Sequence, residues 1–251
     1  MQNKSFISNS LLKKCKQLKK QFKEPKEYQK KITLLKNLIV SIIYFICYCI
    51  VSRDNLIKGL IIFYLNYLFI AYINHYVFHK YKCIFTIIHH YHHSFYNFFS
   101  IFLQIALECV VYIGGYIPAY YFTNTTYFDV WAVIHNLLVY TTVHNINYGY
   151  FHVNNCHELH HANPLTNYNP DFCDILFGTK NQSAPEIENT THYIPNTIIV
   201  TIIILFLQYI CLNKKYEEFL KNTLINIEIL LILICVISSI YLYYYYPDVL
   251  K

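Results

Sequence analysis

The apolar residues of this chain fall into six long blocks separated by short polar segments, and they do not alternate with polar residues at a helical or strand period. The blocks cover residues 37–52, 59–78, 98–121, 127–143, 193–212 and 223–246. A helix needs about 20 apolar residues to cross a membrane, with a range of about 17–25, so most blocks are long enough and the first and fourth are short. The pattern predicts an all-α fold, a polytopic helical membrane bundle of about four to six spans.

Positive charge is concentrated before the first block. Residues 1–36 contain eleven of the twenty basic residues and only two acidic ones, a net charge of +9. Basic segments beside spans tend to stay in the cytosol, where they attract anionic headgroups, so we expect a cytosolic anchor and no nucleic-acid partner. Two hairpins of spans then place both histidine-bearing polar stretches, 79–97 and 144–192, on the cytosolic face.

The last two blocks fit this topology less simply. If both cross the membrane, the turn between them carries Lys214, Lys215 and Lys221 to the far side, against the tendency of positive charge to stay inside. One or both could instead lie in the membrane interface. We therefore expect four parts. Residues 1–36 form a basic cytosolic segment and residues 37–58 a first span with its turn. Residues 59–180 form a central histidine-bearing part, and residues 181–251 a C-terminal membrane hairpin or pair of interfacial helices.

The composition agrees with a membrane protein. Hydrophobic residues make up 55% of the 251 residues and charged residues only 14%, whereas soluble domains are about a quarter charged and disordered chains have few aromatic residues. Nine cysteines are present, but no pair has the spacing of a zinc knuckle or a redox motif, so we expect reduced thiols that pack as small apolar groups. The basic segment is not followed by a short apolar core with a cleavage site, which argues against a secretory signal.

Eight of the thirteen histidines form three clusters with helical spacing. His75 and His79 form an HxxxH pair, and an HxxHH cluster occurs within 89–93 and again within 157–161. Positions i, i+3 and i+4 share one helix face, so each cluster presents two or three imidazoles in one direction. Eight nitrogen donors are too many for one metal ion and suit two adjacent ions. For His90, off the face of its cluster, the role stays open, and a role as ordinary polar residues is favoured for His135, His152 and His192.

Imidazole alone does not identify the metal, because zinc, copper, iron and nickel all bind it. Structural zinc sites usually include cysteine, and no cysteine here has a suitable spacing to the histidines. Neutral imidazoles leave iron with its full positive charge and with room for an oxygen species, and a site at the membrane surface is open to a lipid from the side. These features favour redox chemistry on a lipid over hydrolysis.

The order and spacing of the clusters resemble the histidine boxes of the fatty acid hydroxylase and sterol desaturase superfamily of integral-membrane di-iron oxidases. Two further segments carry the resemblance, which covers about residues 60–180. Asn167-Tyr168-Asn169 stands where the family usually has N-Y-G or N-F-G, and residues 174–179 read D-I-L-F-G-T, similar to its D-x-L-F-G-T ending. The resemblance implies that nine histidines bind the metal ions: His75, His79, His89, His92, His93, His144, His157, His160 and His161.

One further histidine matches a branch of the family, and three features differ from the usual family pattern. His144, at the predicted cytosolic end of the fourth span, resembles the extra histidine that sterol desaturases carry before the last box. Asn169 replaces the usual glycine, which is tolerable because asparagine enters the left-handed backbone region more readily than most residues. The stretch from Asn169 to Asp174 is shorter than usual, and Cys173 stands where the family has tryptophan. These differences affect the expected substrate more than the metal.

The resemblance implies an O2-dependent oxidase that hydroxylates or desaturates a membrane lipid, a sterol or a fatty-acyl chain, in lipid biosynthesis. It implies two non-haem irons (Fe) as cofactors, O2 as co-substrate, and no catalytic residues beyond the metal ligands. It also implies an endoplasmic reticulum location and an external electron donor such as cytochrome b5 with its reductase, which the basic N-terminal segment could help to dock. Candidate acceptors for the second ring nitrogens are Glu158, Asp171 and Asp174, although a role as a solvated or capping carboxylate is favoured for each of them.

Two other classes of function stay open. One is a metal-binding membrane protein without catalysis, such as a zinc or iron transporter, although transporters bind ions near the middle of the membrane and these clusters lie at the ends of spans. The other is a degenerate member of the family that keeps the boxes but has a structural or regulatory role.

Overall fold

A computed structural model describes residues 26–52, 71–81, 83–95, 97–114, 130–212 and 214–250. Within these ranges the regular structure is helical, so the predicted all-α class is confirmed for them. The basic segment up to residue 25 and most of the second apolar block lie outside the described residues. The helices are α2 (Lys26–Val51), α4 (His75–Lys80), α5 (Ile84–Ser94), α6 (Phe98–Gly114), α8 (Val130–Thr142), η2 (Val143–Tyr150), α9 (Cys156–Ala162), α10 (Asp171–Phe177), α11 (Tyr193–Ile210), α12 (Lys214–Tyr245) and η3 (Pro247–Leu250).

Three of the described helices are long and apolar enough to cross a membrane, at Glu27–Val51, Tyr193–Ile210 and Glu218–Tyr245. Helices α2 and α12 begin well before their apolar blocks, because the preceding lysine and glutamate residues are good helix formers. Within the described residues, helices α6 and α8 have 17 and 13 residues, and α8 continues directly into η2. The chain is therefore a helical protein with the features of a membrane protein.

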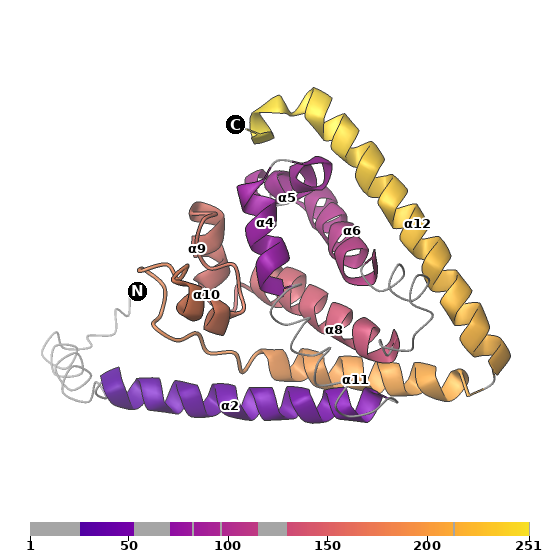
Figure 1. Cartoon of the computed structure of the whole chain (residues 1–251). Coiled ribbons are helices and arrows are strands. Elements are labelled where there is room, and N and C mark those ends of the chain that lie inside the picture. The colour runs from indigo at the N-terminus through magenta and orange to yellow at the C-terminus, as the bar shows by residue number, and fades with distance from the viewer. Residues whose placement is uncertain are drawn as a thin grey trace, which may run out of the picture.

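Helices α2 and α11 lie side by side and run in the same direction (Figure 1). At one end, the Gln208 side chain donates a hydrogen bond to the Val51 carbonyl at 2.6 Å. Toward the other end, Asn37 Nδ2 donates to the Glu188 carbonyl at 2.6 Å, and Asn37 Oδ1 accepts from the backbone N–H and the hydroxyl of Thr190. The start of α11 is thereby fixed beside the first half of α2.

Helix α12 packs along α6 and α5 and closes the other side of the molecule (Figure 1). Leu103 and Leu107 of α6 are buried in one cluster with Cys235 and Leu242 of α12. The turn between α11 and α12 lies at the opposite end of the molecule from α9 and α10 (Figure 1). The lysine-bearing turn and the last histidine cluster are therefore at different ends.

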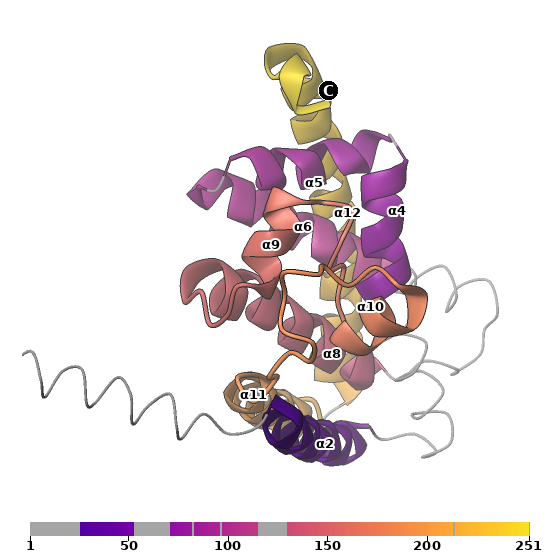
Figure 2. The same ribbon diagram turned by 90° about the vertical axis from the view of Figure 1, so that its left-hand side faces the viewer.

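Helices α9 and α10 lie on the side of the molecule where α2 begins, which faces the viewer in Figure 2, and α4 and α5 lie near the C-terminal end of α12 (Figure 1). Helix α8 continues without interruption into the π-helix η2, whose Val143 and Tyr148 pack in one buried cluster with Trp131 of α8 and Val200 of α11. This packing holds η2 in place between the apolar helices and the segment that carries the last histidine cluster.

Candidate metal centre

The three histidine clusters lie on three short helices, α4, α5 and α9, as their spacing predicted. Helix α5 begins with reciprocal bonds in which the Cys83 backbone N–H donates to Thr86 Oγ1 at 2.9 Å and that hydroxyl donates to the Cys83 carbonyl. Ahead of α9, the side chain of Asn154 accepts the backbone N–H of Cys156 at 3.0 Å. These polar side chains accept the backbone N–H groups of Cys83 and Cys156 at the starts of α5 and α9, and such bonds stabilise the start of a short helix.

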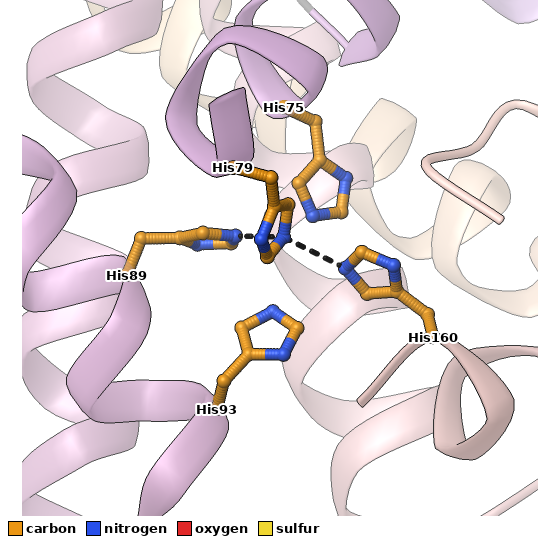
Figure 3. A group of neighbouring side chains, drawn as sticks. All are labelled: His75, His79, His89, His93 and His160. Atoms are coloured by element: carbon orange, nitrogen blue, oxygen red, sulfur yellow. Dashed lines mark hydrogen bonds between the residues drawn. The ribbon is translucent and has the colours of Figure 1, made fainter. Parts of the chain in front are cut away.

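One group of imidazoles combines residues from all three helices (Figure 3). Its nitrogen atoms lie within 4.8 Å of one another. The Nε2 atom of His79 lies 2.8 Å from Nε2 of His89 and 3.1 Å from Nε2 of His160. The members of this first group are His75, His79, His89, His93 and His160.

A second group consists of His92, His157 and His161, again with nitrogen atoms within 4.8 Å of one another. His157 and His161 approach through their Nε2 atoms at 2.9 Å. The two groups are adjacent, since the rings of His93 and His161 stack with their centroids 4.1 Å apart. Each HxxHH cluster contributes to both groups, so eight of the nine predicted ligands form two neighbouring donor sets.

His144, the ninth predicted ligand, belongs to neither group but lies beside the second one. Its ring centroid is 4.7 Å from that of His157 and 5.8 Å from that of His92. It is buried on η2, and its Nε2 atom has no hydrogen-bond partner among the described residues. A metal ion held by the second group would lie close to this nitrogen.

Oxygen atoms around the site fix which nitrogen of several rings carries the proton. His75 Nδ1 donates to the Tyr168 carbonyl and His160 Nδ1 to the Thr166 carbonyl, both at 2.6 Å, and His89 Nδ1 donates to Gln104 Oε1 at 3.2 Å. Each of these rings therefore turns an Nε2 lone pair toward its neighbours. Several lone pairs facing one point repel one another unless a cation lies between them, and metal-binding histidines commonly have this hydrogen-bonded second nitrogen.

Burial keeps these imidazoles neutral. Loss of solvent, followed by the nearby charges of the other rings, holds the pKa of His89, His92 and His93 well below the usual value. The same causes lower the pKa of His79 to about 3 and that of His161 to about 4. Metals bind the neutral form of imidazole, so the groups present ready donors at neutral pH.

The segment after α9 supports the first group. The Asp174 carboxylate accepts the backbone N–H groups of Tyr168 at 2.9 Å and Asn169 at 2.8 Å, and also the Thr179 hydroxyl at 2.7 Å. Asn169 has a φ of 58°, so asparagine occupies the left-handed conformation expected where the family has glycine. Asp174 thus holds the loop at Tyr168 and Asn169, and the Tyr168 carbonyl accepts from His75. Asp174 therefore supports an acceptor of a ligand ring and does not itself accept from the ring.

The other two candidate acceptors serve different purposes. Glu158 points away from the groups and pairs with His152 Nδ1 at 3.0 Å, with both side chains exposed. Asp171 pairs with Lys180 and accepts the backbone N–H of Glu188 at 3.1 Å. Neither carboxylate contacts a ligand ring, which agrees with the favoured interpretation of both as solvated or capping carboxylates.

Two side-chain acceptors for the imidazole N–H groups lie on α6 and were not among the predicted residues. Gln104 accepts from His89, and Glu108 accepts the Nδ1–H of His144. Glu108 is the single charged residue in the apolar block 98–121, and Gln104 precedes it by one helical turn. A lone charged residue in an apolar block is expensive and usually functional, and this signal could have identified the pair.

The isolated histidines have other partners. His135 lies within hydrogen-bonding distance of the Thr201 hydroxyl, with Nε2 and Oγ1 3.1 Å apart, and His192 Nδ1 donates to the Asn189 carbonyl at 3.2 Å. His90 is half-buried and belongs to neither group. These positions agree with the interpretation of His135 and His192 as ordinary polar residues.

A small cavity borders the first group between α4, α6 and α8. His75 and His89 form one part of its wall, and Gln104, Glu108 and Tyr140 form another. The site therefore has open space beside two of its rings.

Comparison of the chain with protein-family models, with curated proteins and with solved structures finds no match.

Proposed function

We propose that this protein is an O2-dependent di-iron membrane oxidase that hydroxylates or desaturates a lipid, a sterol or a fatty-acyl chain, as in the fatty acid hydroxylase and sterol desaturase superfamily that its motifs resemble. The observation that carries the proposal is the pair of adjacent groups of buried imidazoles, with five and three members. Two neighbouring sets of neutral nitrogen donors suit two metal ions, and imidazole binds iron well.

The first group would hold one iron, and the second group together with His144 would hold the other. Two bound irons would supply the activation of O2 and the attack on an unactivated C–H bond, with electrons from an external donor such as cytochrome b5 and its reductase. The chain itself supplies orientation. The backbone carbonyls of Tyr168 and Thr166 and the side chains of Gln104 and Glu108 keep the Nε2 atoms directed toward the metal positions.

The chain also limits access of water. The Tyr168 ring lies against the rings of His75, His79 and His160, with centroids 5.7–5.8 Å apart. His160 and His89 are almost fully buried. A site from which water is excluded protects reactive intermediates from side reactions.

A lipid substrate fits the surroundings of the centre. The helix α10 beside the site exposes Phe172, Ile175 and Leu176 while burying Cys173 and Asp174. An exposed apolar helix face next to apolar helices favours contact with the membrane interface. A lipid could then approach the site without leaving the membrane.

The arrangement of the helices bears on which side of the membrane the histidine site faces. The start of α2, which follows the basic segment, lies on the same side of the molecule as α9, which carries the last histidine cluster (Figure 1). Positive charge favours the cytosolic side. We therefore propose a site that faces the cytosol, in the endoplasmic reticulum membrane as the resemblance implies.

Turnover in the presence of a reductase, cytochrome b5 and candidate sterols and acyl lipids tests the proposal. The wild-type protein is expected to form an O2-dependent alcohol or alkene, and His160→Ala is expected to abolish it because His160 has a buried ring in the first group. His192→Ala is the matched control, since His192 lies outside both groups, and it should retain nearly normal turnover. Equal activity of His160→Ala and the wild-type protein would remove the di-iron assignment.

A further inference from the structure

Glu108 is a buried carboxylate on an apolar helix, and three side-chain donors surround it. His144 Nδ1 and Gln104 Nε2 donate to Oε1, the second at 3.1 Å, and Asn145 Nδ2 donates to Oε2 at 3.1 Å. Glu108 is only 5% exposed, so water does not replace these partners. Hydrogen bonds of this kind compensate a buried carboxylate for its lost hydration.

The contacts of Glu108 extend to both imidazole groups. Its partner His144 lies beside the second group, with its ring 4.7 Å from that of His157. Its other partner, Gln104, accepts from His89 of the first group. Glu108 and Gln104, on successive turns of α6, therefore connect His144, beside the second group, with His89 of the first group.

We infer that Glu108 is a positioning residue that makes His144 a metal ligand of the second group and, through Gln104, orients His89 in the first. With Nδ1–H held by the carboxylate, His144 carries its lone pair on Nε2, the buried nitrogen without a partner among the described residues. The second group then has four nitrogen donors instead of three. This inference rests on the proposed metal centre.

A carboxylate is the side chain that suits this position. Its two oxygens accept three hydrogen bonds and carry no proton of their own. Glutamine has the same size but one oxygen and two N–H donors, so Glu108→Gln would direct an N–H toward the N–H of either Asn145 or His144. The ring of His144 would lose its fixed tautomer, or Asn145 would lose its acceptor.

The test measures Fe(II) binding by the full-length protein in detergent under anaerobic conditions. Glu108→Gln is expected to weaken binding of one iron by about 10- to 100-fold, the usual effect of removing a partner of a metal-bound histidine, and to change the Mössbauer spectrum of the iron that remains bound. Glu228→Gln is the matched control. Glu228 is also a buried carboxylate on an apolar helix, but its oxygens have no hydrogen-bond partner among the described residues, so iron binding should be unchanged.

A double-mutant cycle separates positioning from general support of the fold. If Glu108 acts on the second group through His144, the Glu108→Gln/His144→Ala protein binds the iron of that group as weakly as His144→Ala alone. Losses of affinity for that iron that add in the double variant would overturn the inference. Gln104→Leu is a second variant that leaves the Glu108–His144 contact in place and should weaken the iron held with His89. This variant tests the contact between Gln104 and His89 if Glu108→Gln does not fold.

The outcomes distinguish the two proposals. A wild-type protein that binds no Fe(II) overturns the metal centre and the inference with it. A wild-type protein that binds two irons, together with a Glu108→Gln protein of equal affinity and an identical spectrum, overturns the role of Glu108 and leaves the metal centre intact.

Discussion

At the scale of single residues, the two nitrogens of each imidazole have different tasks. Where the structure gives His75 and His160 a carbonyl acceptor for Nδ1, it leaves Nε2 to face the neighbouring rings of the group. The spacing of histidines in a helix indicates which rings share a face, and this made eight members of the two groups predictable. The acceptors were not predictable in the same way, because two are backbone carbonyls and the others, Gln104 and Glu108, come from a separate helix.

Acid should destabilise the metal-free protein. Unfolded histidine has a pKa of about 6.5, whereas the pKa of His79 is about 3 and that of His161 about 4 in the folded protein. Below about pH 6.5 the unfolded chain therefore binds more protons than the folded one, and the free energy of unfolding falls as the pH drops toward about 4. Thermal unfolding of the metal-free protein in detergent measures this. A Tm that is constant from about pH 7 to about pH 4.5 would show that the rings are not buried in neutral form.

At the scale of elements, hydrophobicity predicts where helices occur better than where they end. The block 193–212 corresponds closely to α11, but α2 and α12 begin earlier because polar helix formers extend them beyond their apolar parts. The continuation of α8 into a π-helix has no signal in the sequence pattern, although π-helical segments often occur at functional sites. Here η2 carries His144 to the edge of the second group.

The contact between α2 and the segment before α11 provides an element-scale prediction. Asn37→Ala removes the side chain that bonds Glu188 and Thr190, so it should lower the stability by about 1–3 kcal/mol and speed proteolysis within residues 181–192. Thermal unfolding and limited proteolysis in detergent measure the two effects. Ser41→Ala is the control, because among the described residues the Ser41 hydroxyl donates to the Asn37 carbonyl of its own helix. Equal behaviour of the two variants would contradict a role of Asn37 in joining the elements.

At the scale of the whole molecule, the sequence indicated a helical membrane protein and one histidine-rich end. It did not indicate how the clusters combine. Each HxxHH cluster divides between two groups because α4, α5 and α9 approach from different directions, with the rings of His93 and His161 in contact between them. This arrangement depends on packing between distant segments, and local spacing contains no information about it.

The metal content of the full-length protein tests the two-group centre most directly. The protein is purified in detergent without a metal-binding tag and loaded anaerobically with Fe(II), and the bound metal is counted per chain. Two donor sets predict two irons per chain, with loss of iron in His160→Ala and no loss in His192→Ala. A wild-type protein that binds no iron after loading, or whose iron is unaffected by His160→Ala, would contradict the centre.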